Sequence, residues 1–278
     1  MSKIEKALEK AGEERGSLQL VPGAVAGGRV APWTALLGQR SDDPETISRM
    51  DGNEPTLLSA DELWDRGIIH PQRTEEPAVQ VFRELRTKIV QQSLGQNVVI
   101  LITAVNKGNG GSFIARNLGA AFAFDSAKTS LLVDCNLGNP SVHQLLSDAS
   151  APGLVDYFEN PEIDVSRIIH PVGIPRFRAI PTGGLRDVPM EHLASLKMRG
   201  LMDTLRERYR ERFIVLDGPS MANIADVRIL SELADYVLVV ARHGRTTNAQ
   251  IESGLSAISN TKLLGIVFND EPRIPWTR

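Results

Sequence analysis

Short apolar runs alternate with amphipathic stretches over most of the chain. Short buried strands that alternate with helices are typical of a mostly parallel sheet with helices on both faces. The pattern therefore predicts an α/β domain over 76–278, with right-handed crossovers between strands. The apolar runs are 98–104, 130–134, 177–181, 213–217, 236–241 and 263–268, and the helical stretches are 77–94, 112–124, 189–211, 223–234 and 246–260.

The first 75 residues follow a different pattern. Residues 1–16 predict a short amphipathic segment, either a fraying terminus or a segment that folds on a partner, because so short a helix is unstable alone. Residues 17–75 contain scattered prolines without long apolar periodicity, which predicts a largely flexible linker. Within it, Ser59 and Glu62 form a capping-box pattern, so we expect a short helix there. Its apolar residues, which could pack on the domain, are Leu58, Leu63, Trp64 and Ile68.

The composition excludes several classes of protein. A formal net charge of −3 gives no strong basic field, so we expect no nucleic acid as a partner. The single cysteine, Cys135, rules out an intramolecular disulfide and a cysteine-rich zinc site, and suggests a reducing compartment. No run of 18 apolar residues occurs, so we expect no membrane span and a cytoplasmic location.

A glycine-rich segment follows the run 98–104, where a phosphate-binding loop belongs in such a fold. Gly108, Gly110 and Gly111 would let backbone N–H groups surround an anion, and a helix starting near Ser112 would add its positive end. The strict pattern G-x-x-x-x-G-K-[ST] fails at Val105 and Gly111. Taken alone, the segment also fits a tight turn without a ligand.

Two acidic residues close apolar runs farther along the chain. Asp134 ends one run, where its carboxylate could hold a metal ion or cap the following turn. Asp217 ends another run before a Gly-Pro turn, which is the form of a Walker B acid that reaches Mg²⁺. Since ligands bind at the carboxyl ends of parallel strands, the three loops together predict one nucleotide site.

Residues 76–270 resemble the catalytic domain of bacterial tyrosine kinases (BY-kinases). These are MinD/ParA-like deviant Walker P-loop ATPases that act with polysaccharide co-polymerases in exopolysaccharide and capsule production. The opening MSKIEKALEKA resembles the subgroup at exosortase and exopolysaccharide loci. The segments that carry the resemblance are EPAVQVFRELRTKI (76–89), VVILITA (98–104), LLVDCNLGNPSVHQLL (131–146), FIVLDGPS (213–220) and GIVFN (265–269).

The resemblance implies a site for ATP or ADP with Mg²⁺. Asp134 and Asp217 would be the remaining catalytic acids, and with Ser112 they would hold the metal ion. Asn269 would face the adenine. The implied phosphate-binding residues are Lys107, Gly108, Gly110, Gly111, Ser112 and Phe113.

The departures from the family pattern concern the groups that perform the chemistry. Gly111 stands where the family has the Walker A lysine, and Asn136 stands where it has a second acid. An amide cannot act as a base and is a poorer ligand for a hard cation. Gly138 replaces an arginine and Ser220 a proline. Lys107 is the remaining lysine that could reach a phosphate from the other side of the loop.

The substrate and assembly features of the family are also altered. BY-kinases phosphorylate a tyrosine cluster in their own tail, whereas the tyrosines here, which we expect to be packing residues, are Tyr157, Tyr209 and Tyr236. The family's ring-forming E-x-x-R-x-x-R motif falls on Gln80, Arg83 and Arg86, where Gln80 cannot form the ion pair. The helix at 77–94 either supports self-association or presents a solvated basic face.

Three hypotheses follow. The first is a pseudokinase, a regulator or scaffold that a membrane polysaccharide co-polymerase (a chain-length determinant protein) recruits to the inner face of the membrane. The second is an active tyrosine kinase or ATPase of the same pathway that uses Lys107 and Asp134 in altered roles. The third is a ParA/MinD-like positioning ATPase, for which neither a membrane-targeting tail helix nor a basic DNA-binding surface is evident.

Overall fold

A computed structural model describes residues 20–22, 58–184, 190–208 and 211–270 of the chain. The strands are β1 (Leu20–Pro22), β2 (Val99–Ala104), β3 (Thr129–Asp134), β4 (His170–Pro171), β5 (Phe177–Ile180), β6 (Arg212–Asp217), β7 (Tyr236–Arg242) and β8 (Leu263–Asn269). They form one sheet in the order β1-β8-β7-β2-β6-β3-β5-β4. The pairs at the two edges, β1 with β8 and β4 with β5, are antiparallel, and every other pair is parallel. The predicted fold class is thus confirmed.

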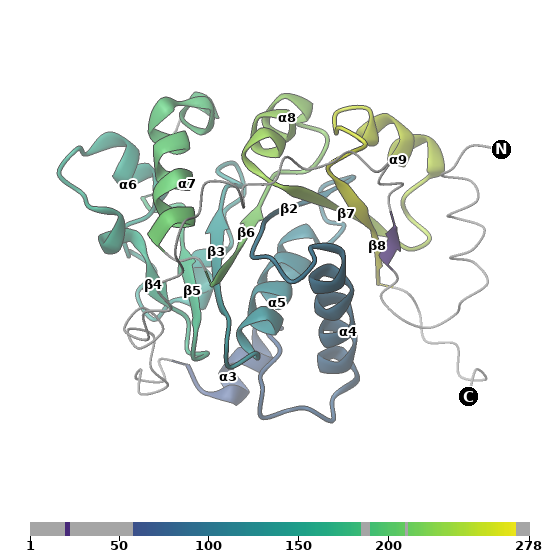
Figure 1. The fold of residues 1–278 in the computed structure, drawn as a ribbon, viewed down its shortest axis with the longest axis horizontal. Helices are drawn as coiled ribbons and strands as arrows, with labels where there is room; N and C mark the ends of the chain where they lie inside the picture. The colour runs from purple at the N-terminus through teal and green to yellow at the C-terminus, as the bar shows by residue number, and fades with distance from the viewer. Residues whose placement is uncertain (1–19, 23–57, 185–189, 209–210, 271–278) are drawn as a thin grey trace.

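Helices cover both faces of this sheet (Figure 1). The helices are α3 (Ala60–Asp65), α4 (Pro77–Gln92), α5 (Gly111–Ala123), α6 (Leu154–Glu159), α7 (Leu196–Arg208), α8 (Ile224–Leu233) and α9 (Asn248–Leu255), with short 3-10 turns η2 (Val142–Leu145), η3 (Val165–Ile168) and η4 (Met190–Ala194). The first three helices lie on one face, and α6 to α9 lie on the other.

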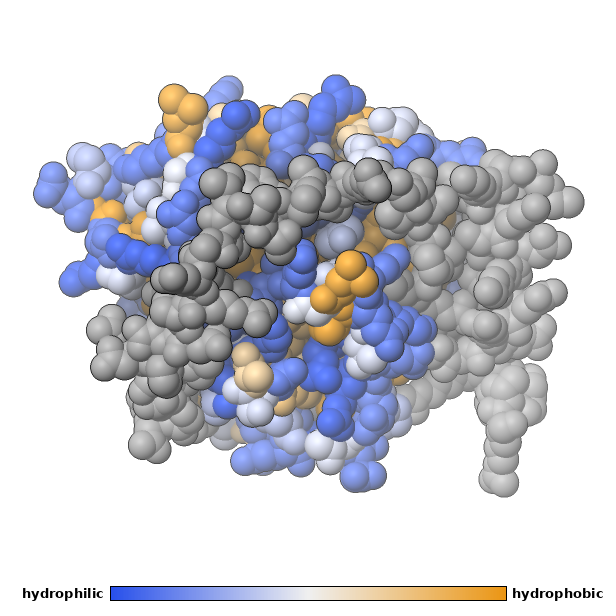
Figure 2. Space-filling model, viewed as in Figure 1, coloured by the Kyte–Doolittle hydropathy of each residue, from blue (hydrophilic) through white to orange (hydrophobic). Residues whose placement is uncertain are grey.

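The central strands are buried on both faces, which is why they read as continuous apolar runs. Every residue of β2, β3 and β6 is buried. One apolar layer joins them to α4 and α5, and a second joins them to the helices of the opposite face. On the side of the molecule seen in Figure 2, apolar residues are scattered among hydrophilic ones. Within the described residues, no helix combines the length and the apolar character that crossing a membrane requires.

The stretch 189–211, predicted as helical throughout, is divided into two elements. Ser195 stands between η4 and α7, where its hydroxyl accepts a hydrogen bond from the Met198 N–H (3.1 Å) and donates one to the His192 carbonyl (2.6 Å). A serine side chain that accepts from an N–H three residues later starts a new helix. The break is therefore an N-cap.

The described part of the linker predicted over 17–75 packs on the domain from Leu58 onward. Ser59 and Glu62 form the expected capping box at α3, and the apolar residues around this helix join the core beside α5. Asn117 of α5 is buried and binds this segment: its Oδ1 accepts from the Ile69 N–H and its Nδ2 donates to the Gly67 carbonyl, both at 2.8 Å. The last part of the predicted linker is thus ordered, because it buries apolar side chains and satisfies its backbone on α5. The predicted amphipathic segment 1–16 and the predicted linker up to residue 57, apart from β1, lie outside the described residues.

Candidate nucleotide-binding site

The loop between β2 and α5 has the backbone of a phosphate-binding turn. Gly108 and Gly110 have φ values of 84° and 93°, a left-handed conformation that favours glycine. A Cβ atom on Gly110 would also lie 2.0 Å from Asn269 Nδ2. Gly110 caps α5, so the helix begins at Gly111, next to the predicted position of Ser112.

The first turn of α5 leaves backbone donors without partners. The N–H groups of Gly110, Gly111, Ser112 and Phe113 form no hydrogen bond with the described part of the chain. A helix N-terminus with free N–H groups and a positive dipole end attracts anions. These residues are therefore arranged to receive a phosphate group.

Residues from β7, β8 and the loop after β7 hold this phosphate loop in place. Asn109 is buried, and its Nδ2 donates to Thr246 Oγ1 (2.9 Å). Asn269 Nδ2 donates to the Asn109 carbonyl (3.0 Å), and Arg242 Nη1 donates to the Gly108 carbonyl (3.4 Å). Asn269, expected at the adenine, thus contacts the loop backbone directly, and its contact with a base stays a prediction.

The two predicted acids lie side by side at the carboxyl ends of β3 and β6. Asp134 and Asp217 are directly opposite in the parallel pair of β3 and β6, and both are fully buried. Asp134 accepts backbone N–H bonds from Asn136 (3.2 Å), Ser141 (2.9 Å) and Val142 (2.9 Å). Asp217 accepts from the Ser112 hydroxyl at 3.1 Å and the Ser141 hydroxyl at 3.4 Å.

Burial disfavours the charged forms of both carboxylates. Burial, followed by the charge of Asp134, raises the pKa of Asp217 to about 8. Burial also raises the pKa of Asp134, but its three backbone N–H bonds oppose this shift. We assign the negative charge of the pair to Asp134 and the proton at neutral pH to Asp217, because backbone donors stabilise a carboxylate.

The raised pKa of Asp217 predicts that the stability of the cation-free protein falls with rising pH. The folded value of about 8 exceeds the ordinary value of 3.8, so between these values the folded state holds a proton that the unfolded state has released. The free energy of unfolding should fall by up to about 1.4 kcal/mol per pH unit in this window. Asp217→Asn should flatten the dependence in urea unfolding with a chelator present. Equal slopes for the two proteins would contradict the prediction.

The oxygen atoms at this edge fit a magnesium ion in part. Mg²⁺ is usually bound by one or two carboxylates together with substrate phosphates, and the Ser112 hydroxyl, Asp134 and Asp217 supply that donor set beside the phosphate loop. The described residues contain no group of three or more acidic, histidine or cysteine side chains suited to a metal ion. These three residues would therefore supply part of the ion's ligands, and the phosphates of a bound nucleotide would complete them.

The structure gives the other predicted site residues different surroundings. Lys107 is exposed and forms no hydrogen bond or ion pair with the described residues. Phe113 is half-buried and packs edge-on against Phe82, with ring centroids 5.9 Å apart. Asn136 is half-buried, with its backbone N–H on Asp134. Among the described residues, Lys107 thus has no partner, whereas Phe113 is anchored in the core.

Sequence reasoning missed Arg116, Ser141 and Arg242. Arg116 follows Ser112 by one helical turn, and its Nε donates to the Ser112 carbonyl (3.2 Å). Burial lowers the pKa of Arg116, and the charges of Asp217 and Asp134 oppose this shift. A charged residue within the apolar stretch 114–123 was the available signal. Ser141 and Arg242 carried none, because only the tertiary fold brings them to the site.

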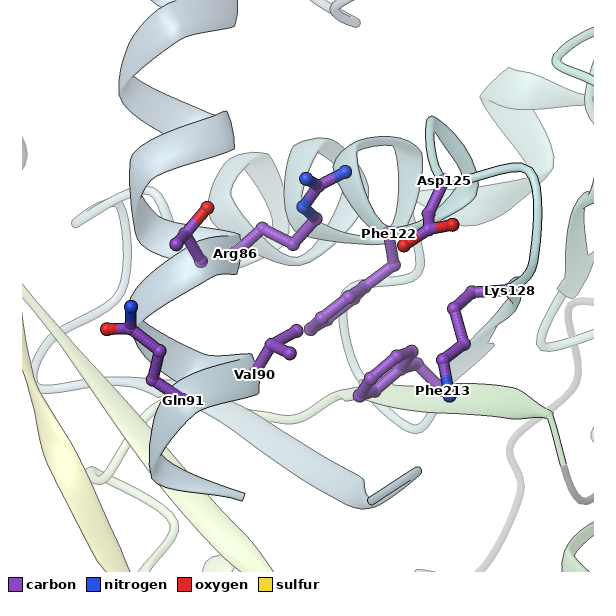
Figure 3. Close-up of a pocket in the computed structure, with 8 residues that line it drawn as sticks. Arg86, Val90, Gln91, Phe122, Asp125, Lys128 and Phe213 are labelled. Atoms are coloured by element: carbon purple, nitrogen blue, oxygen red, sulfur yellow. The ribbon is translucent and has the colours of Figure 1, made fainter. Parts of the chain in front are cut away.

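The predicted oligomerisation residues lie away from the nucleotide site. Gln80 and Arg83 are exposed on α4, whereas Arg86 turns inward and donates to the Ala121 carbonyl (3.3 Å) near the end of α5. Arg86 also borders a cavity of about 160 Å³ near the amino end of β6, away from the nucleotide site. The floor of this cavity is the stacked pair Phe122 and Phe213 (Figure 3). The three residues thus do not share one exposed face, and self-association through α4 stays a prediction.

The chain has relatives among bacterial proteins, although no family model matches it. The putative tyrosine-protein kinase EpsB of Ralstonia solanacearum is 32% identical over 199 residues, which cover 70% of this chain and 26% of EpsB. The succinoglycan biosynthesis transport protein ExoP of Rhizobium meliloti is 28% identical over 201 residues, 68% of this chain and 24% of ExoP. The chain thus spans about a quarter of these relatives.

The fold also matches a solved kinase domain. The kinase domain of the Escherichia coli tyrosine kinase ETK superposes with a TM-score of 0.66 at 20% identity, over 81% of this chain and 97% of that domain. At this identity the match establishes the fold, and the sequence relatives establish the kinship. The chain is a homologue of the bacterial tyrosine-protein kinases and has the fold of the BY-kinase domain.

Proposed function

We propose that this chain is a pseudokinase of exopolysaccharide or capsule production. It keeps the BY-kinase fold and a place for a nucleotide, but it hydrolyses ATP and transfers phosphoryl groups inefficiently. It acts in the cytoplasm as a regulator or scaffold for a membrane polysaccharide co-polymerase. The observation that carries the proposal is the use of the Asp134 carboxylate, which accepts three backbone N–H bonds.

Through those three bonds, Asp134 holds the backbone that follows β3 in place. A general base needs a lone pair within reach of the proton that it removes. The Asp134 carboxylate is fully buried, and three of its about four lone-pair sites hold the backbone of the segment that follows β3, one at Asn136 and two at Ser141 and Val142. Asn136, the nearest residue that could replace it, carries an amide and cannot accept a proton as a base.

The site also lacks a fixed positive charge for the phosphate groups at the first position of α5. Gly111 lies at the first position of α5 and has no side chain to place a charge on a phosphate. Without that ammonium, the charge that develops during phosphoryl transfer loses a preorganised donor, and such a donor is worth about 3 kcal/mol in a transition state. Lys107 is exposed and has no partner among the described residues, so no contact there provides the preorganisation that catalysis requires.

The pathway is proposed from the relatives. ExoP is named as a succinoglycan biosynthesis transport protein, and EpsB as a putative tyrosine-protein kinase. Both are much longer than the matched stretch. By this likeness, we expect the chain to act in such a system together with a membrane partner.

Phosphoryl transfer from γ-labelled ATP tests the proposal. We expect the purified chain with Mg²⁺ to label neither itself nor an added tyrosine-containing peptide above the level of an Asp217→Ala variant. The reason is that Asp134 is buried and bound by the backbone, and that the phosphate-binding ammonium is missing. Label transfer that disappears in Lys107→Ala would contradict the proposal and support an active kinase.

A further inference from the structure

Arg116 occupies a position that links the phosphate loop to the acidic pair. It lies four residues after Ser112 on α5, so both side chains share one helical face. Long helical side chains point back toward the N-terminus, and the Arg116 Nε accordingly donates to the Ser112 carbonyl at 3.2 Å. The Ser112 hydroxyl in turn donates to Asp217 Oδ1 at 3.1 Å. A half-buried guanidinium is thus fixed beside the residues suited to hold a metal ion.

Two acidic side chains and one guanidinium interact at this end of the strands. Asp134 and Asp217 are fully buried in adjacent strands, and both interact electrostatically with the Arg116 guanidinium. His143 on η2 also lowers the pKa of Asp134 through its charge. An arginine side chain stays charged in proteins, so Arg116 contributes a permanent positive charge.

We infer that Arg116 is the built-in counter-cation of the Asp134–Asp217 pair and weakens the binding of a divalent cation there. A permanent positive charge beside this pair lowers the negative potential that attracts a metal ion, and partial burial limits its screening by solvent. When no metal ion is bound, the same charge stabilises the Asp134 carboxylate, which carries the negative charge of the pair. Arg116 is therefore a positioning residue that sets the affinity of the Asp134–Asp217 pair for a metal ion.

This inference deepens the proposed function, and its test does not depend on nucleotide binding or catalysis. The probe is Mn²⁺ alone, because its free concentration is read directly from its electron paramagnetic resonance signal. Full-length wild type, Arg116→Gln and Arg116→Lys are titrated at neutral pH without nucleotide. We expect Arg116→Gln to bind Mn²⁺ at least about tenfold more tightly than the wild type, and Arg116→Lys to stay within about threefold of it.

A matched control lies at the other end of the same helix. Arg176 is also half-buried, and its Nε donates to the Asp125 carbonyl (3.1 Å) beyond the end of α5. Arg176→Gln should leave Mn²⁺ affinity unchanged, because this arginine lies away from the carboxylates. If Arg116→Gln does not fold, Arg116→Met keeps the aliphatic packing and is measured instead.

Three outcomes would overturn the inference. One is an affinity for Mn²⁺ that is unchanged or weaker after the charge of Arg116 is removed. Another is an equal gain in Arg176→Gln, since that would show a general effect of net charge. The third is a gain that persists when Asp217→Asn is added to Arg116→Gln, because the ion would then bind elsewhere. None of these outcomes bears on whether the wild type transfers phosphate, so the proposed function stands or falls separately.

Discussion

Replacing Gly111 with lysine is expected to tighten the binding of ATP with Mg²⁺ by about ten- to a hundredfold. A charge-assisted hydrogen bond to phosphate is worth roughly 1.5–3 kcal/mol, and about 1.4 kcal/mol corresponds to a factor of ten in affinity. The new Cβ would lie 3.2 Å from Ala104 Cβ, a close approach that a shift of a few tenths of an ångström relieves. Isothermal titration calorimetry with ATP and with ADP measures the change.

The same substitution at Gly200 provides the control for the lysine experiment. Gly200 lies on α7, where an added Cβ meets nothing within 4 Å, so Gly200→Lys adds an equal charge on the other face of the sheet. Its affinity for ATP should equal that of the wild type. A folded Gly111→Lys protein that binds ATP no better than Gly200→Lys would contradict the assignment of this loop as the phosphate site.

Replacing Asn117 with alanine is expected to destabilise the fold by about 3 kcal/mol. The substitution leaves the buried Ile69 N–H without its acceptor, which costs about 1–3 kcal/mol, and it removes the hydrogen bond to the Gly67 carbonyl. It also removes the tie between α5 and the segment that contains α3. Urea unfolding followed by circular dichroism gives the difference in the free energy of unfolding.

The exposed Asn248 at the start of α9 provides the comparison. Asn248→Ala should change the free energy of unfolding by less than about 0.5 kcal/mol, as surface substitutions usually do. If Asn117→Ala were equally mild, the segment from Leu58 to residue 75 would not be an integral part of the domain.

The core of the fold was predictable because its strands are buried on both faces. Fully buried strands such as β2 and β6 appear in the sequence as unbroken apolar runs, and the helices between them have helical spacing. The edge strands were not predictable in the same way. The two residues of β4, His170 and Pro171, are half-buried and give no alternating pattern, and β1 is a three-residue strand within a proline-containing segment.

The candidate site was predictable only where a local motif marks it. Glycines after a strand and acids at strand ends have recognisable spacing, so the loop at 108–112 and the pair Asp134 and Asp217 were named from the sequence. Arg116 and Ser141 act through contacts that depend on helix phase and on how η2 packs. The packing of the segment before residue 76 likewise depends on tertiary contacts, since Leu58 and Leu63 are buried in the core beside α5.

We propose that the missing side chains, and not a lost fold, disable the chemistry. The most direct measurement is the steady-state ATP hydrolysis of the wild type and of the double variant Gly111→Lys/Asn136→Asp, each with saturating Mg²⁺ and corrected by its Asp217→Ala counterpart. We expect the corrected turnover of the wild type to lie near the detection limit, and that of the double variant to be at least about tenfold above this limit. Robust wild-type turnover that Asp217→Ala abolishes, equal to or above that of the double variant, would contradict it.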